Sequence, residues 1–198
     1  MRLISGSAGG IPLEVPKSVT RPTQDRVRQA IFNMLGDLIT GARVLDLFAG
    51  SGALGLECLS RGAESALLID QDRGACEVIR KNIAKTKLEG ATIRQGDVFK
   101  TLAQLAGTGQ TFDLIFADPP YAHKPGDVDL SAKLTADANF LQLVAHGGSV
   151  ILESLALKGS QGFTGHWEML RDREYGSTRI LWLRRYPGKL AQSAEGHL

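Results

Sequence analysis

Short apolar runs alternate with longer amphipathic segments from about residue 40 onward. Each run is rich in Val, Ile, Leu or Phe and is bounded by Gly or polar residues, as is typical of buried strands. The predicted strands are Ala42–Phe48, Ser65–Asp70, Ala91–Gln95, Phe112–Ala117 and Ser149–Glu153. The predicted helices are Ala53–Arg61, Arg73–Lys85, Phe99–Leu105 and Asp129–Ala145. This alternation predicts a parallel sheet that is covered by helices on both faces.

The pattern changes after the fifth strand. Trp167–Tyr175 and Thr178–Arg185 are two strand-like runs with no helix between them, and a turn at Tyr175-Gly176-Ser177 joins them. They predict an antiparallel hairpin at the edge of the sheet. The expected fold is therefore α/β and Rossmann-like, with a mostly parallel seven-stranded sheet that ends in a C-terminal antiparallel hairpin.

The first forty residues read as an attachment to this sheet. Arg2–Ser7 and Ile11–Val15 predict a small hairpin around Ala8-Gly9-Gly10, and Thr23 is the expected N-cap of a helix that ends near Leu35. The predicted organisation is an N-terminal extension over residues 1–40, one α/β domain over 41–188 and a disordered tail over 189–198.

The composition is that of an ordinary globular domain: 198 residues, of which 43% are hydrophobic and 22% charged. A net charge of +2 does not by itself indicate a nucleic-acid binder, but residues 171–190 hold six basic side chains against two acidic ones. Such a segment forms either a face for phosphates or a solvated surface, and the sequence leaves both open.

Further features exclude other classes of protein. No run of about 18 apolar residues is present, and the apolar stretch after Met1 is too short for a signal peptide. Cys58 and Cys76 lack metal-ligand spacing and read as small core residues in a reducing compartment. A cytoplasmic monomer with no membrane contact is expected.

A glycine-rich turn follows the first predicted strand of the sheet. Gly50, Gly52 and Gly55 match G-x-G-x-x-G, which also suits NAD, FAD or a plain tight turn. Asp46, four residues before the first glycine, would repel a pyrophosphate and attract a cation. S-adenosylmethionine carries an ammonium and a sulfonium and no phosphate, so it suits this turn; the alternative is that Asp46 caps the loop.

Two more acidic residues stand at the ends of predicted strands. Asp70 ends the second strand, where a carboxylate typically accepts ribose hydroxyls, and Asp97 follows the third, where it is placed to accept an adenine amino group. Either one alone also reads as a helix N-cap. Ligands of open α/β sheets bind at the carboxyl ends of the strands, so three acids at successive ends favour a nucleoside site.

Asp118-Pro119-Pro120-Tyr121 stands at the end of the fourth predicted strand. Two prolines prevent helix or sheet from continuing and leave a stiff loop that presents carbonyls, a carboxylate and an aromatic ring. Asp118 and the Pro119 carbonyl could accept hydrogen bonds from the two N–H groups of an exocyclic base amine, which would direct the lone pair of the amine nitrogen toward a methyl group. Tyr121 could stack on the base. Such methyl transfer needs no metal. The alternative interpretation of Asp118–Tyr121 is a rigid turn that only ends the strand.

These motifs together resemble the RsmD-type methyltransferases, class I S-adenosylmethionine-dependent enzymes that modify N2 of a guanine in small-subunit (16S) ribosomal RNA. The most family-specific segment is Arg21-Pro22-Thr23-Gln24-Asp25-Arg26-Val27-Arg28-Gln29-Ala30-Ile31-Phe32-Asn33. The segments Asp46–Gly52 and Asp118–Tyr121 are shared with a wider set of amino-methylating enzymes. The resemblance spans residues 1 to about 186.

The resemblance implies a set of site residues. It places Asp118, Pro119, Pro120 and Tyr121 at the reacting amine. The implied cofactor contacts are Asp46, Phe48, Ala49, Gly50, Ser51, Gly52, Asp70, Gln71, Asp97, Val98 and Asp118. The implied RNA contacts are Arg21, Arg26, Arg28 and Lys124. The opening hairpin here, Ser5–Gly10, lacks the extra Arg or Lys usual in that family, so either RNA binding is weaker or the phosphate contacts shift onto the three arginines.

Two other classes of function remain open from the sequence. One is a methyltransferase that acts on adenine N6 in DNA or RNA, or on a glutamine amide, since those chemistries share the proline-rich loop. The other is a nucleotide-binding oxidoreductase or a catalytically inactive binding module. Asp46 and the terminal hairpin argue against the oxidoreductase, and the intact Asp118–Tyr121 loop argues against the inactive module.

Overall fold

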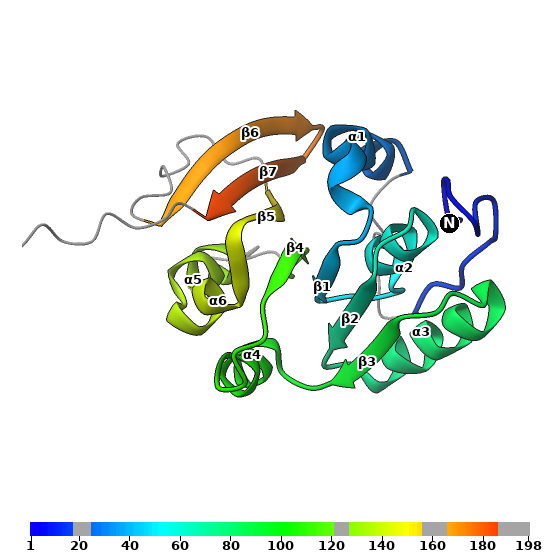
Figure 1. Ribbon diagram of the computed structural model, residues 1–198, viewed down its shortest axis with the longest axis horizontal. Helices are drawn as coiled ribbons and strands as arrows, with labels where there is room; N and C mark the ends of the chain where they lie inside the picture. The colour runs from blue at the N-terminus through cyan, green and yellow to red at the C-terminus, as the bar shows by residue number, and fades with distance from the viewer. Residues whose placement is uncertain (18–24, 121–126, 156–165, 186–198) are drawn as a thin grey trace, which may run out of the picture.

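The computed structural model describes residues 1–17, 25–120, 127–155 and 166–185 of the chain, and a seven-stranded sheet forms its centre (Figure 1). The strands are β1 (Arg43–Leu47), β2 (Ser65–Asp70), β3 (Ala91–Gln95), β4 (Phe112–Ala117), β5 (Val144–Leu155), β6 (Trp167–Tyr175) and β7 (Thr178–Arg185). The helices are α1 (Asp25–Leu35), the 3₁₀ helix η1 (Gly36–Ile39), α2 (Ala53–Ser60), α3 (Arg73–Thr86), α4 (Val98–Ala106), α5 (Leu130–Ala136) and α6 (Ala138–Leu143). Within the described ranges, no helix is long and apolar enough to cross a membrane.

The strand order in the sheet is β3-β2-β1-β4-β5-β7-β6. Strands β1 to β5 run parallel, whereas β7 is antiparallel to both β5 and β6. The predicted fold class is confirmed: the sheet is mostly parallel, has seven strands and ends in an antiparallel hairpin.

One predicted helix is wrong in its extent. The segment expected to be helical over Asp129–Ala145 forms two short helices, because Asp137 adopts an extended backbone and caps α6 by accepting hydrogen bonds from the amides of Asn139 and Phe140. Val144 and Ala145 belong to β5, which begins earlier than the predicted Ser149 because Val144 pairs with Phe112 of β4.

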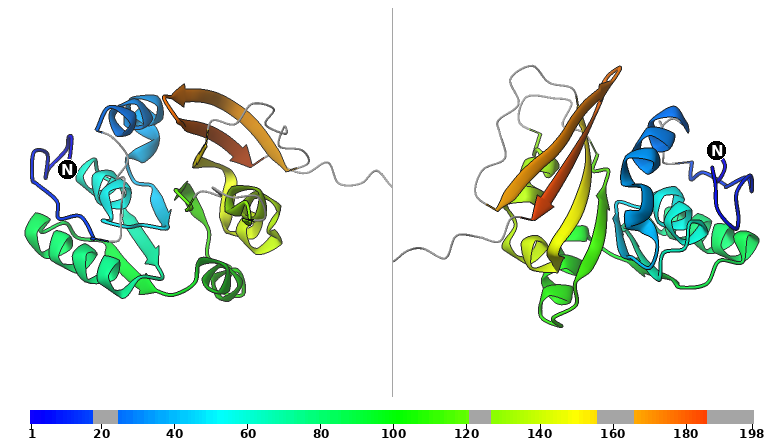
Figure 2. Two further views of the ribbon diagram at one scale, coloured as in Figure 1. Left: turned by 180° about the vertical axis from the view of Figure 1, so that it is seen from behind. Right: turned by 45° about the horizontal axis from the view of Figure 1, so that its top comes forward.

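Apolar side chains alternate between the two faces of the sheet and form two core clusters. In β1, Val44 lies in one cluster and Leu45 and Leu47 lie in the other. The first cluster contains buried residues of α1, α2 and α3, and the second contains those of α4, α5 and α6. The sheet therefore separates two helical layers, as the two views in Figure 2 also show. This is the doubly covered arrangement that the alternation of strand and helix predicted.

The N-terminal segment packs against α2 without forming regular strands. Its predicted hairpin is reduced to one isolated bridge, Arg2 to Pro12, with backbone hydrogen bonds such as Leu3 N–H to Ile11 O at 3.0 Å. Leu3 and Leu13 are buried in the same cluster as the residues of α1 and α2. The extension thus shares the core of the sheet domain.

Candidate active site

The candidate site lies where the strand order reverses. The chain runs from β1 through β2 to β3 on one side and then returns to β4 on the other side of β1. Leu47, the last residue of β1, pairs with Ile69 of β2 and with Ala117 of β4. The carboxyl ends of these strands therefore lie at one edge, which is where open α/β sheets bind their ligands.

The turn between β1 and α2 has an unusual backbone. Three alternate residues, Phe48, Gly50 and Gly52, have φ angles of 60°, 56° and 76°. This left-handed region costs glycine little but is strained for phenylalanine, and such strain persists where the surrounding contacts impose it. The sequence did not indicate this conformation for Phe48, because phenylalanine has no preference for it.

Hydrogen bonds from three other elements hold this turn. The Gly50 N–H donates to Asp70 Oδ2 at 2.8 Å, the Gly55 N–H donates to Asp46 Oδ2 at 2.9 Å, and Asn82 Nδ2 of α3 donates to the Ser51 carbonyl at 2.9 Å. These bonds fix the turn from β2, β1 and α3 at once.

Close packing also favours glycine at position 52 of the turn and at position 55 in the first turn of α2. A Cβ atom at Gly52 would lie 2.9 Å from Leu68 Cδ2, and one at Gly55 would lie 3.2 Å from Asp46 Oδ2. The first turn of α2 therefore rests directly on β1 and β2, which is the role of the later glycines in the G-x-G-x-x-G motif.

Asp46 is buried beneath this turn, with 2% of its surface exposed. The pKa of its carboxyl is raised from 3.8 to about 7. Burial is the largest cause and the charge of Asp70 adds to it, whereas the hydrogen bond from the Gly55 N–H acts in the opposite direction. Among the described residues, no Lys or Arg lies within 4.0 Å of the Asp46 carboxylate. Its bond to Gly55 matches the alternative reading, that it caps the loop, and its contact with a cofactor stays a prediction.

We expect the stability of the chain relative to its Asp46→Asn variant to fall as the pH rises from about 4 to about 7. The folded chain binds a proton at Asp46 that the unfolded chain has released in this range, because the folded pKa is the higher one. At about 1.36 kcal/mol per pKa unit, the difference in unfolding free energy changes by up to about 4 kcal/mol. Urea unfolding of both proteins at pH 5, 6, 7 and 8 measures it, and parallel pH profiles would contradict the raised pKa.

The other predicted cofactor residues lie around the same edge. Ala49 and Ser51 are buried, Phe48 and Asp70 are half-buried and Gln71 is exposed. Asp97 is exposed and caps α4, since its Oδ1 accepts the Lys100 N–H at 2.9 Å, and Val98 is buried in the first turn of that helix. That cap is the structural role that the sequence left open for Asp97.

The proline-rich loop begins directly beside the glycine turn. Asp118 follows Ala117, which pairs with Leu47 in the neighbouring strand. Asp118 is half-buried, Pro119 is buried and Pro120 is exposed. Tyr121 and Lys124 lie outside the described residues, as do Arg21 and Thr23, so their predicted roles stay predictions.

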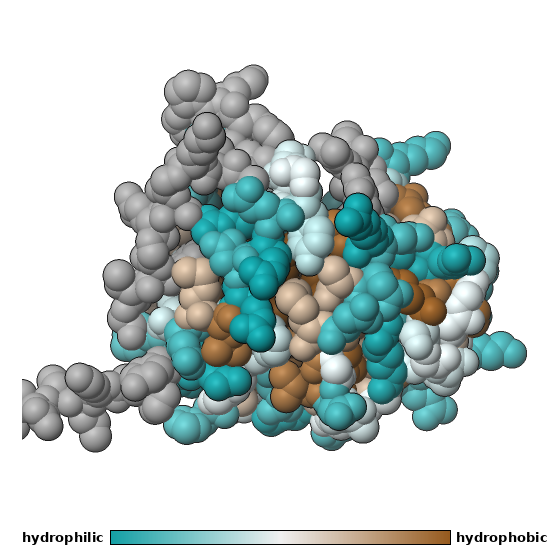
Figure 3. Space-filling view, turned by 90° about the horizontal axis from the view of Figure 1, so that it is seen from above, coloured by the Kyte–Doolittle hydropathy of each residue, from teal (hydrophilic) through white to brown (hydrophobic). Residues whose placement is uncertain are grey.

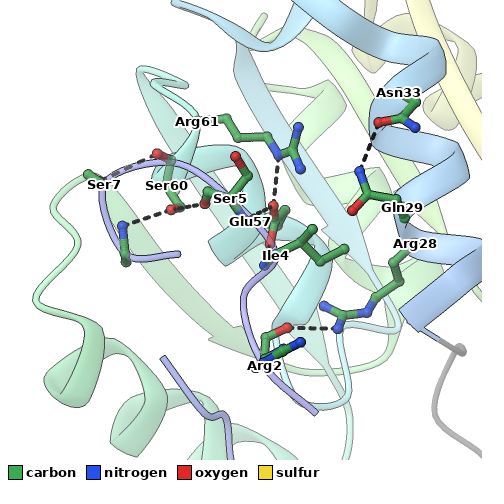
Figure 4. Close-up of polar contacts among 11 residues, drawn as sticks. Arg2, Ile4, Ser5, Ser7, Arg28, Gln29, Asn33, Glu57, Ser60 and Arg61 are labelled. Atoms are coloured by element: carbon green, nitrogen blue, oxygen red, sulfur yellow. Dashed lines mark hydrogen bonds and ion pairs between the residues drawn. The ribbon is translucent and has the colours of Figure 1, made fainter. Parts of the chain in front are cut away.

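The burial of Arg28 argues against its predicted contact with RNA, which stays a prediction. Arg28 is fully buried, because it lies on the same face of α1 as Ile31, Phe32 and Leu35. Its Nη2 donates to the Arg2 carbonyl and to Asp25 Oδ1, both at 2.7 Å, so it joins α1 to the N-terminal segment (Figure 4). Arg26 is exposed on the outer face of the helix and remains available to phosphate.

Sequence reasoning missed three buried polar residues that attach the N-terminal segment. Asn82 accepts the Glu14 N–H as well as donating to Ser51, while Glu57 and Ser60 of α2 bind the backbone of residues 4–8 (Figure 4). Asn82 is a polar residue three positions after Ile79 in the buried stripe of α3, which was its one signal in the sequence.

Three comparisons with known proteins agree with this geometry. The family described as conserved hypothetical protein 95 matches residues 1–184. Ribosomal RNA small subunit methyltransferase D of Escherichia coli is 37% identical over 177 residues, which are 89% of this chain and 85% of that protein. The solved structure of yhhF from Escherichia coli has a TM-score of 0.77 at 32% identity and covers 93% of this chain and 97% of its own. SMU.776, complexed with S-adenosylhomocysteine, has a TM-score of 0.64 at 16% identity, covers 80% and 48%, and shows the fold alone.

Proposed function

The chain belongs to the family described as conserved hypothetical protein 95, and on that premise we propose that it transfers a methyl group to the exocyclic N2 amine of a guanine in small-subunit ribosomal RNA. The observation that carries the proposal is the position of Asp118, which begins the proline-rich loop at the end of β4, directly beside the glycine turn of β1. A methyl donor on the turn and an amine at the loop would meet at this edge.

The activity class follows from the relatives. The chain is an S-adenosylmethionine-dependent ribosomal RNA methyltransferase, as the family and the 37% identical small-subunit methyltransferase D indicate. The atom that receives the methyl group is the finer part of the proposal, and it rests on the chemistry of the loop and on the resemblance of the motifs.

The turn suits a cationic cofactor better than a phosphate. Asp46 is buried without a basic partner within 4.0 Å in the described part of the chain, and Asp70 places a second carboxylate beside Gly50. Asp70, together with the ionised form of Asp46, favours a positive ligand at this turn and opposes a negative one. S-adenosylmethionine supplies an activated methyl group on a sulfonium. Asp46 and the turn would hold its amino-acid end, Asp70 its ribose and Asp97 its adenine.

The loop residues prepare the amine. The lone pair of a guanine N2 amine is delocalised into the ring, so the nitrogen is a poor nucleophile. Asp118 and the Pro119 carbonyl accept hydrogen bonds from the two N–H groups of this amine. These hydrogen bonds favour a pyramidal nitrogen and direct its lone pair away from the loop and toward the turn. Positioning of this kind supplies much of the rate advantage of a transfer reaction. Asp118 is also placed to take the proton that the methylated nitrogen releases.

Transfer of a labelled methyl group to small ribosomal subunits tests the proposal. The subunits come from cells that lack this gene, and mass spectrometry identifies the modified nucleoside. We expect N2-methylguanosine in the small-subunit RNA. Incorporation as N6-methyladenosine, or into protein glutamine, would move the function to the alternative amines that the same loop chemistry accepts.

A further inference from the structure

The β6–β7 hairpin presents a face with three exposed arginines, Arg171, Arg173 and Arg184. In an antiparallel pair, residues directly opposite each other point to the same side of the sheet. Arg171 pairs with Trp182, and Arg173 pairs with Ile180. Trp182 and Ile180 belong to the core cluster on the α1 side of the sheet, so the two arginines point to that side as well.

The positive charge on this face is poorly balanced. Arg171 and Arg173 are exposed, and among the described residues neither has a carboxylate within 4.0 Å. Each donates through Nη1 to a carbonyl of its own strand, which leaves most of its N–H groups for a ligand. Arg184 is exposed on the same face, with Glu168 at 4.0 Å as its partner.

Two acidic residues of the same strand, Asp172 and Glu174, lie on its other face, whereas Glu168 lies opposite Arg184 on the α1 side. Asp172 is opposite Leu181, and its carboxylate pairs with Arg179 through two hydrogen bonds. Glu174 is opposite Arg179. Alternation along β6 therefore places Arg171 and Arg173 on the α1 side, and Asp172 and Glu174 on the side of α4 to α6.

This face is in register with the candidate site. Ala117 pairs with Leu152 of β5, so Asp118 and Glu153 occupy the next row of the sheet, and Glu153 pairs with Ile180 opposite Arg173. Three strand spacings of about 4.8 Å put the Arg173 backbone roughly 14 Å from that of Asp118. Arg171 follows at about 7 Å along β6. Figure 3, which looks down on the hairpin and α1, shows a broad hydrophilic surface around apolar patches in its middle.

We propose that the α1-side face of the β6–β7 hairpin, with Arg171, Arg173 and Arg184, binds phosphate groups of the ribosomal RNA on one side of the target base. The inference rests on the proposed function and adds the surface that holds the substrate. Arg forms bidentate hydrogen bonds with phosphate, so a line of guanidinium groups suits a polyanionic chain. Because this line begins level with Asp118 in the sheet, it suits an RNA whose reacting base lies at the proline-rich loop. With Arg28 buried, this face would add to the phosphate contact that is predicted for the exposed Arg26 of α1.

The test measures RNA affinity at several salt concentrations. The double variant Arg171→Gln/Arg173→Gln is compared with Arg80→Gln/Lys85→Gln, which removes the same charge from exposed positions of α3. We expect the hairpin variant to bind a small-subunit RNA fragment at least tenfold more weakly at 150 mM salt. The slope of log K against log salt should drop by about 0.7–0.9 for each lost contact. The α3 variant should keep the wild-type slope, and Arg171→Lys/Arg173→Lys should recover most of it.

Three outcomes would overturn this inference or the function beneath it. If the hairpin variant and the α3 variant bind RNA equally well, the hairpin is not the phosphate surface. If the hairpin variant weakens binding to assembled subunits but not to protein-free RNA, its partner is a protein. If the wild-type chain binds S-adenosylhomocysteine by calorimetry and neither binds nor methylates ribosomal RNA, the proposed function itself fails.

Discussion

Replacing Asp118 by alanine is expected to lower the rate of methyl transfer by a factor of about 10² to 10³ and to leave the affinity for S-adenosylhomocysteine within twofold of the wild type. In the proposed mechanism the carboxylate accepts a hydrogen bond from the amine as positive charge develops on its nitrogen, and loss of one such preorganised group typically costs this factor. The glycine-rich turn keeps its hydrogen bonds with Asp70, Asp46 and Asn82, so we expect cofactor affinity to be unchanged. Single-turnover rates and calorimetry measure the two quantities.

Asp113→Ala is the matched control for Asp118→Ala. Asp113 lies on the same strand, five residues before Asp118, at the opposite edge of the sheet, where its carboxylate pairs with Arg43 at 2.9 Å. Arg43 lowers the pKa of Asp113 through this hydrogen bond, and both side chains are 41% exposed. Loss of this pair should cost about 1 kcal/mol or less and leave the rate unchanged. Equal rates for the two variants would refute the role of Asp118.

The sequence predicted the parallel strands well because their apolar runs are short and continuous. The bounds of the parallel strands β2, β3 and β4 match the predicted segments, and so do those of the antiparallel strands β6 and β7. A strand that is buried on both faces needs apolar residues at successive positions, so the ends of the apolar run mark the ends of the strand. The break at Asp137 was missed because a cap is a local hydrogen-bonding choice of one side chain, which the periodicity of the surrounding apolar residues does not record.

The positions of the candidate site residues were predictable in part. Asp46, Asp70 and Asp118 lie toward one edge of the sheet, as predicted, because parallel strands end at one edge, and their roles stay predictions. The burial of Arg28 could have been expected from its spacing with Ile31, Phe32 and Leu35 in the apolar stripe of α1, although its charge suggested an exposed position. The bond between Asn82 and Ser51 joins residues 31 positions apart, and local patterns contain no information on such a contact.

Replacing Glu57 by alanine is expected to destabilise the chain by about 3–5 kcal/mol. The Glu57 side chain is fully buried, and its two oxygens accept from Ile4 N–H at 2.6 Å, Ser5 N–H at 3.0 Å and Arg61 Nε at 2.7 Å (Figure 4). The substitution leaves two backbone donors and a largely buried guanidinium without their acceptor, and each such loss costs the full desolvation of the donor. Urea unfolding at fixed pH measures the difference.

Glu77→Ala is the matched control for Glu57→Ala, because both glutamates pair with an arginine one helical turn away. Glu77 and Arg73 are 53% and 81% exposed, so their pair should contribute less than about 0.5 kcal/mol. Amide hydrogen exchange adds a local readout: in Glu57→Gln, residues 4–8 should exchange faster while β4 keeps its protection. A Glu57→Ala cost equal to that of Glu77→Ala, with unchanged exchange, would mean that apolar burial of Leu3 and Leu13 alone holds the N-terminal segment on α2.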